Sequence, residues 1–279
     1  MRRRTTIPPR SAAAAAAVAA LVGCAGIAAA HEEILVQIAK IDERLAQGES
    51  SADLYLKRGE LYRLHEEFAR AFADYDQAES IDPQVEGLAL ERAAAFLETA
   101  EPAKALPILD KVLQGTPQHA PALTLRARGK AALGFPAEAA ADLTKAIAAT
   151  AEPRPDQYVE RAQIQLSLPE GGPEAALAGL EEGIAHFGAA GLTLHEFALQ
   201  IELDLGRQDA AAARAAKIVA SQPANLRWHL RHAEILADLG RGGEAKAAAA
   251  EALERIEALP PARRRSAAMA EMEAKFRGY

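Results

Sequence analysis

The stretch from Ser51 to Pro83 reads SADLYLKRGELYRLHEEFARAFADYDQAESIDP, and its spacing predicts two antiparallel helices. Small residues recur where two helix backbones would have to approach closely, and large aromatic residues stand beside them to fill the remaining space. A proline at the end lacks a backbone N–H donor and closes the second helix. These positions are Tyr55, Gly59, Tyr62, Ala71, Tyr75, Ala78 and Pro83.

The same pattern recurs along the chain in steps of about 34 residues, with two slightly longer steps. A period of this length indicates repeated helix pairs, each of which must stack on its neighbours to bury its apolar face. The position of Gly59 returns as Ala93, Ala127, Ala162, Leu199 and Ala233, and that of Ala71 returns as Ala105, Ala139, Ala176, Ala211 and Ala245.

This pattern resembles the tetratricopeptide repeat, although Lys130 replaces a large apolar residue and Leu199 replaces a small one. The resemblance implies an all-α protein, namely a right-handed superhelical solenoid of about six helix pairs over residues 51–259. We expect capping helices over residues 31–50 and 260–279, because Ile34, Ile38 and Ile41 share one helical stripe and a solenoid needs polar ends. The fold should be at least ~70% helix without strands, well above the usual third.

Composition agrees with a helical protein. Apolar residues make up 50% of the 279 residues but aromatic residues only 5%, and alanine, the best helix former, dominates the apolar share. Runs of β-branched and aromatic residues that would indicate strands are missing from the sequence.

Residues 1–30 have the features of a signal peptide. Four arginines precede position 11, and Ala12–Val22 is an uncharged apolar run of eleven residues, too short to cross a bilayer. Leu21-Val22-Gly23-Cys24 closes this run and resembles the lipobox of bacterial lipoproteins, which implies cleavage before Cys24 and lipidation of its thiol. Ala28-Ala29-Ala30 offers an alternative cleavage before His31, which would release a soluble periplasmic protein. Both processing routes remain open.

The charge balance argues against nucleic acid as a partner. Without residues 1–30 the chain has 28 Lys and Arg against 39 Asp and Glu, whereas nucleic-acid binding needs a basic face. Residues 224–279 are the mildly basic exception, with ten basic and eight acidic residues. Arg263, Arg264 and Arg265 are interpreted as solvated helix surface, with contact to anionic lipid as the alternative.

No residue pattern predicts catalysis, a metal or a cofactor. Cys24 is the only cysteine, so a disulfide within the chain and a cysteine-based zinc site are excluded. The sequence has no Gly-rich phosphate loop, nucleophile elbow or zinc-protease motif. His195, His229 and His232 could meet on neighbouring helices, but His195 and His229 share a repeat position that is normally a packing site, which favours packing over zinc binding. We therefore predict that the protein is not an enzyme.

Arginine recurs at Arg58, Arg92, Arg126 and Arg161. Asp74 follows Arg58 by sixteen residues, and Asp142 follows Arg126 by the same interval. We interpret these residues as ion pairs between the two helices of a unit, rather than as a ladder that binds an anion.

The predicted binding site follows from the repeat family, in which the first helix of each unit lines a concave groove. The groove positions that we single out are Leu56, Glu60, Arg63, Leu90, Ala94, Leu97, Arg128 and Gln163. The family's carboxylate clamp uses Lys and Asn, and it is not expected here. The mainly apolar floor predicts an extended or helical protein segment as the partner, bound in the N-terminal half. Alternatively, the leucines pack between units.

Two functions fit these features. The first is a lipid-anchored scaffold that supports assembly of a complex in the bacterial cell envelope. Ala25 rather than Asp follows the cysteine, which by the family rule implies an outer-membrane lipoprotein facing the periplasm. The alternative is a soluble periplasmic adaptor or regulatory subunit of an enzyme or secretion system.

Overall fold

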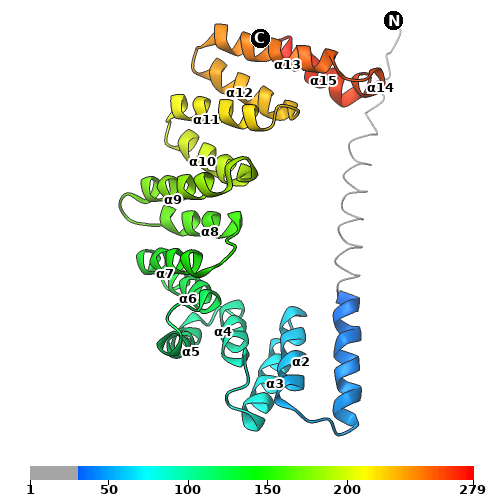
Figure 1. The fold of residues 1–279 in the computed structure, drawn as a ribbon, viewed down its shortest axis with the longest axis vertical. Helices are drawn as coiled ribbons and strands as arrows, with labels where there is room; N and C mark the ends of the chain where they lie inside the picture. Colours follow the sequence, from blue (N-terminus) through cyan, green and yellow to red (C-terminus); the bar gives the residue numbers. More distant parts are fainter. Residues whose placement is uncertain (1–30) are drawn as a thin grey trace, which may run out of the picture. The chain divides into compact units, whose positions relative to one another are not determined.

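The computed structural model describes residues 31–279, of which 79% are helical, and no strand occurs in that range (Figure 1). The predicted all-α fold class is confirmed. A helix runs through residues 31–46, and the others are α2 (Ala52–Leu64), α3 (Phe68–Ile81), α4 (Leu88–Glu98), α5 (Pro102–Gly115), α6 (Ala120–Ala132), α7 (Pro136–Ala149), α8 (Pro155–Leu166), α9 (Gly172–Phe187), the short 3₁₀ helix η1 (Gly188–Ala190), α10 (Leu192–Asp204), α11 (Gln208–Ser221), α12 (Leu226–Asp238), α13 (Gly242–Glu257), α14 (Pro261–Arg264) and α15 (Ala267–Phe276). The leader and Cys24 lie outside the described residues.

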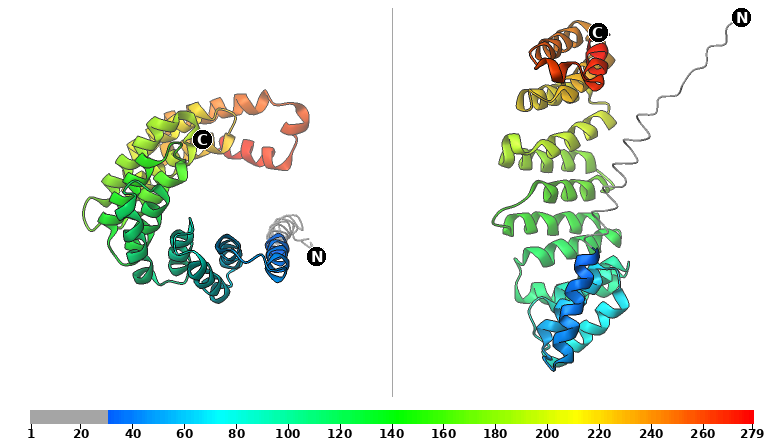
Figure 2. Two further views of the ribbon diagram at one scale, coloured as in Figure 1. Left: turned by 60° about the horizontal axis from the view of Figure 1, so that its bottom comes forward. Right: turned by 90° about the vertical axis from the view of Figure 1, so that its right-hand side faces the viewer.

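The chain divides into two compact units, and the boundary along the sequence falls between Leu133 and Gly134. The described part of the first unit holds the helix over residues 31–46 and α2 to α6, while the second unit holds α7 to α15. Within each unit successive helices pack as antiparallel pairs, such as α2 with α3 and α12 with α13 (Figure 2). None of the helices described within residues 31–279 is both long and apolar enough to span a bilayer.

The close approach of α2 and α3 depends on a glycine. A Cβ atom on Gly59 of α2 would lie 2.6 Å from Cε1 of Tyr75 and 3.2 Å from the carbonyl oxygen of Ala71, both on α3. Tyr75 and Ala71 are fully buried, so the ring has little room to move. Gly59 therefore occupies the helix crossing that its repeat position predicts.

The helix over residues 31–46 belongs to the core of the first unit. Ile38 and Ile41 are buried in one cluster with Tyr62 and Tyr75 of α2 and α3, and Ile34 and Leu45 pack against it. The helix ends at residue 46, and Gly48 follows with φ +90°, a conformation that favours glycine. Its predicted role as a cap is consistent with this packing but stays a prediction.

The last segment is divided into two helices, α14 and α15, rather than the continuous helix that we expected. Ser266 interrupts it, because its side chain accepts a hydrogen bond from the Met269 backbone N–H (3.3 Å) and so starts a new helix. α15 packs on α12 and α13, with Phe276 buried beside Ile256. This contact covers the end of the last helix pair in the second unit.

Candidate partner-binding surfaces

The predicted groove residues of the first unit come from first helices that lie side by side. α2 contacts α4, and α4 contacts α6. Leu56 of α2 and Leu90, Ala94 and Leu97 of α4 are half-buried, while Arg128 of α6 is exposed. The structure thus brings one part of the predicted set onto neighbouring helices. Gln163 is exposed on α8 of the second unit.

The groove leucines also take part in packing between helices. Leu56 packs against the core cluster of the first unit. The position that a Cβ on Gly129 would take in α6 is 3.3 Å from Cδ2 of Leu97, so α4 and α6 touch there. Leu56 and Leu97 therefore pack between helices and still keep some exposed surface, and their role in partner binding stays a prediction.

Arg63 and Glu60 have structural partners. The Arg63 guanidinium bonds Glu91 (3.0 Å) and Glu98 (2.5 Å) on α4, and its side chain is only 13% exposed. Glu60 accepts a bond from Lys57 (2.8 Å) on the same helix. Arg63 thus ties α2 to α4, with two carboxylates around its single guanidinium.

The recurring arginines form ion pairs. Arg58 bonds Asp74 through Nε (2.7 Å) and Nη2 (2.6 Å), which confirms that predicted pair. Hydrogen bonding by Asp74, aided by Asp42, raises the pKa of Arg58 and keeps it charged. Arg161 instead bonds the Gly179 carbonyl (2.9 Å) and Glu182 (2.8 Å). The predicted Arg126–Asp142 pair stays a prediction.

A second set of acidic partners was missed in the sequence. Three arginines each bond an aspartate sixteen residues earlier, on the preceding helix of the chain. These pairs are Arg58–Asp42 (2.6 Å), Arg92–Asp76 (2.8 Å) and Arg126–Asp110 (2.8 Å). The aspartates themselves recur every 34 residues, and that period was the available signal. The arginines therefore link successive helix pairs as well as the helices of one pair.

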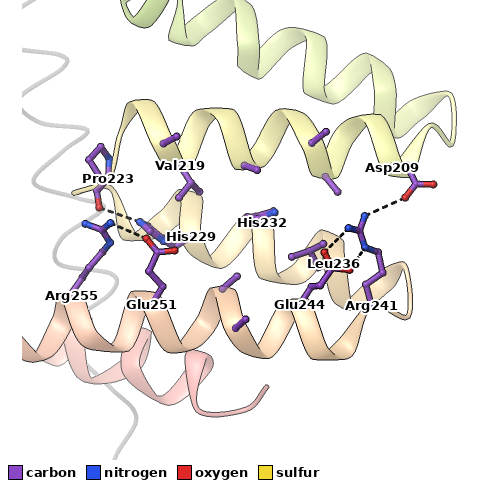
Figure 3. A pocket seen from close by; sticks show the side chains of 16 residues that line it. Asp209, Val219, Pro223, His229, His232, Leu236, Arg241, Glu244, Glu251 and Arg255 are labelled. Atoms are coloured by element: carbon purple, nitrogen blue, oxygen red, sulfur yellow. Dashed lines mark hydrogen bonds and ion pairs between the residues drawn. The ribbon is translucent and has the colours of Figure 1, made fainter.

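The second unit contains a pocket of about 600 Å³ between α11, α12 and α13 (Figure 3). Alanines of α11 and α13 line its walls, and His232 and Leu236 of α12 line its floor. At one end Arg241 bonds Glu244 (2.5 and 2.7 Å) and Asp209 (3.3 Å). At the other end Arg255 bonds Glu251 (2.8 Å). Because each guanidinium has a carboxylate partner, this pocket offers mainly neutral contacts.

The three histidines considered as zinc ligands, His195, His229 and His232, are buried or half-buried between helices of the second unit. His229 is 1% exposed and its Nε2 lies 3.1 Å from the Pro223 carbonyl oxygen. Burial lowers the pKa of His232, and burial together with nearby Arg214 lowers the pKa of His195. Within the part of the chain that the structure describes, no three His, Cys, Asp or Glu side chains are arranged to hold a metal ion.

Comparison with known proteins identifies solved structures that share this fold. No protein-family model and no curated protein sequence matches the chain. Among solved structures, the C-terminal part of a TPR repeat-containing protein from Cytophaga hutchinsonii matches with a TM-score of 0.62 and 12% identity, over 86% of this chain and 94% of that one.

Two further structures match with lower scores. PilW, described as a widely conserved type IV pilus biogenesis factor, has a TM-score of 0.55 and 22% identity over 69% of this chain and 87% of its own. A tetratricopeptide repeat protein from Parabacteroides merdae has a TM-score of 0.51 and 15% identity over 88% and 98%. At these identities the likeness concerns the fold alone. The fold is that of tetratricopeptide repeat proteins, as the sequence pattern predicted.

Proposed function

We propose that this protein is a non-enzymatic scaffold that binds another protein in the bacterial cell envelope, where it supports assembly of a complex. The observation that carries the proposal is the surface of α2 and α4 in the first unit. Arg63 holds the two helices in a fixed relation through Glu91 and Glu98. Leu56, Leu90 and Leu97 keep exposed surface there and can bury apolar side chains of a partner.

The net negative charge of the first unit favours a partner with basic residues. Residues 31–133 contain eighteen acidic and twelve basic residues. An apolar segment with basic residues on either side would complement this surface, and electrostatic attraction would speed its association. We infer that the partner presents such a segment, extended or helical, to α2 and α4.

The lipobox-like sequence supports a location at the membrane. Lipidation of Cys24 would hold the first unit near an envelope complex, because two or more acyl chains anchor a protein stably. PilW, described as a type IV pilus biogenesis factor, has a helix-pair fold of this kind, which is in keeping with the proposal. Cleavage before His31 would instead give a soluble periplasmic adaptor with the same binding surface.

Site-specific crosslinking tests the proposed surface. A photoreactive amino acid in place of Leu90 should give a discrete adduct in cells, whereas the same group in place of Leu64, 48% exposed on the same unit, should not. Ala94→Glu should abolish the adduct, because it places a charge between Leu90 and Leu97 at a half-buried site. An adduct of equal yield from position 64, or one that survives Ala94→Glu in a folded variant, would contradict this location.

A further inference from the structure

A second pocket of the second unit lies where the end of α13 meets α14 and the start of α15. Its volume is about 710 Å³, within the range of sites that bind small ligands. We call it the C-terminal pocket. Most of its lining is apolar and comes from Pro223, Ala224, Leu226, Ala258, Leu259, Ala262 and Met269, and Arg255, Arg263 and Ser266 complete it.

The charged side chains that line the C-terminal pocket are all positive. Both of its charged lining residues are arginines, and no carboxylate lines it. The pocket in Figure 3 differs, because carboxylates line it beside its arginines. A pocket of about 700 Å³ between α3, α4 and α5 also has both signs, with Glu79 and Glu86 facing the same space as Arg92 and Lys111. The C-terminal pocket therefore favours an anion.

Its guanidinium groups have free donors. The Arg263 side chain has no hydrogen bond or ion pair with any described residue, and it is exposed. Arg255 bonds Glu251 through Nη2, but its Nε is buried without a partner. Residues 258–270 contain three arginines and no Asp or Glu, in a protein that is otherwise acidic. A ligand with strong acceptor oxygens would satisfy the exposed donors of Arg263.

The combination of an apolar lining and two arginines indicates the chemistry of the ligand. An inorganic anion would use the arginines and leave the apolar wall in water, whereas a purely apolar ligand would leave Arg263 unpaired. An amphiphile uses both. We propose that the C-terminal pocket binds an anionic phospholipid, with its phosphate at Arg263 and Arg255 and part of an acyl chain against Leu226, Leu259 and Met269. This site is independent of partner binding by the first unit and of lipidation at Cys24.

Titration with a short-chain lipid that stays monomeric tests the proposal without vesicles. Calorimetry of the full chain with dihexanoylphosphatidylglycerol should show saturable binding. The fluorescence of Trp228, the only tryptophan, gives a second signal, because this residue lies on α12 close to Leu226. Dihexanoylphosphatidylcholine should bind more weakly, because its headgroup has no net charge. Inorganic phosphate and dibutyrylphosphatidylglycerol should also bind more weakly, because they bury less apolar surface.

Two exposed substitutions locate the binding. Arg263→Glu and Ala262→Glu on α14 should each weaken binding at least about fivefold, and Lys246→Glu, which reverses an exposed charge on α13 outside the pocket, should leave it unchanged. Circular dichroism should show the same helix content in all three variants. The proposal is overturned if no saturable binding occurs, if phosphate or the choline lipid binds as tightly as the glycerol lipid, or if both glutamate variants bind like the wild type.

Discussion

Gly59 shows how one missing side chain sets the geometry of a helix pair. A leucine there would have to displace the buried ring of Tyr75 or move α2 away from α3. We predict that Gly59→Leu lowers the free energy of unfolding by about 1–3 kcal/mol, as overpacking typically does. Chemical denaturation measures the change.

Gly115 provides the matched control for Gly59. It ends α5, and a Cβ there would have no neighbour within 4 Å. Gly115→Leu should therefore leave the free energy of unfolding unchanged or raise it, because glycine costs about 0.5–1 kcal/mol in a helix. Equal losses in the Gly59 and Gly115 variants would show that α2 and α3 do not need the small residue.

Arg214 forms two ion pairs, one with a buried carboxylate and one with an exposed carboxylate. It bonds Glu202 (2.6 and 2.8 Å), whose side chain is 7% exposed, and Glu181 (2.5 Å), whose side chain is 51% exposed. Glu202→Ala should cost about 3–5 kcal/mol, because it leaves a buried guanidinium without its main partner. Glu181→Ala should cost less than about 1 kcal/mol. Thermal or chemical denaturation that gave the two variants equal stability would refute this assignment.

At the scale of elements, His232 lines the pocket between α11, α12 and α13 and should make the free energy of unfolding depend on pH. Burial lowers its pKa below the ordinary value of 6.5, with His229 and Arg241 adding to the effect and Glu244 and Glu251 opposing it. The unfolded chain therefore binds this proton at a higher pH than the folded chain. As the pH falls below about 6.5, the free energy of unfolding should decrease.

His232→Gln tests this pH dependence. The variant should lose less of its free energy of unfolding between pH 7 and pH 5.5 than the wild type, because it lacks the group that charges on unfolding. Some dependence should remain from His195, whose pKa is also lowered by burial. Denaturation curves at both pH values give the comparison, and identical slopes in wild type and variant would exclude His232 as the cause.

The helix pairs could be predicted from sequence because each follows from a local steric rule. Gly59 and Ala71 stand in the same chain segment as the residues that they contact, so their spacing alone predicts the crossing. The break at Ser266 was missed, since it depends on one side-chain cap inside an otherwise helical pattern.

The pockets could not be predicted from sequence, because they depend on how three successive helices pack against one another. Ala212 of α11 and Ala247 of α13 line the same pocket only after α12 is placed between their helices. Neither alanine differs in the sequence from the many others that fill helix crossings. The unpaired state of Arg263 depends in the same way on which carboxylates lie nearby once α13, α14 and α15 have folded.

For the whole molecule, helix content is the broadest test. The described residues are 79% helical, so circular dichroism of the purified protein should show at least about 70% helix and no sheet. The three solved structures described above share this fold, although only 12–22% of their aligned residues are identical to those of this chain. The fold therefore requires a spacing of small and large residues more than it requires particular residue types. A spectrum with substantial sheet would contradict the fold.

The proposed export to the envelope depends on residues that precede the described part of the chain, and Cys24 is the residue that tests it. If the peptidase cuts before Cys24 and the thiol is lipidated, the protein should sediment with the outer membrane, because Ala25 rather than Asp follows the cysteine. Cys24→Ser should then leave an uncleaved precursor or move the protein to the soluble fraction, since the acyl chains that anchor it are lost.

A second variant separates the two processing routes. Ala30→Leu disturbs the small residue before His31 and should change nothing if Cys24 is the processing site, but it should block maturation if cleavage occurs before His31. Membrane fractionation and mass spectrometry of the mature N-terminus report both results. An unmodified N-terminus at His31, together with a soluble wild-type protein, would exclude the lipid anchor and leave the soluble periplasmic adaptor as the form in which the first unit meets its partner.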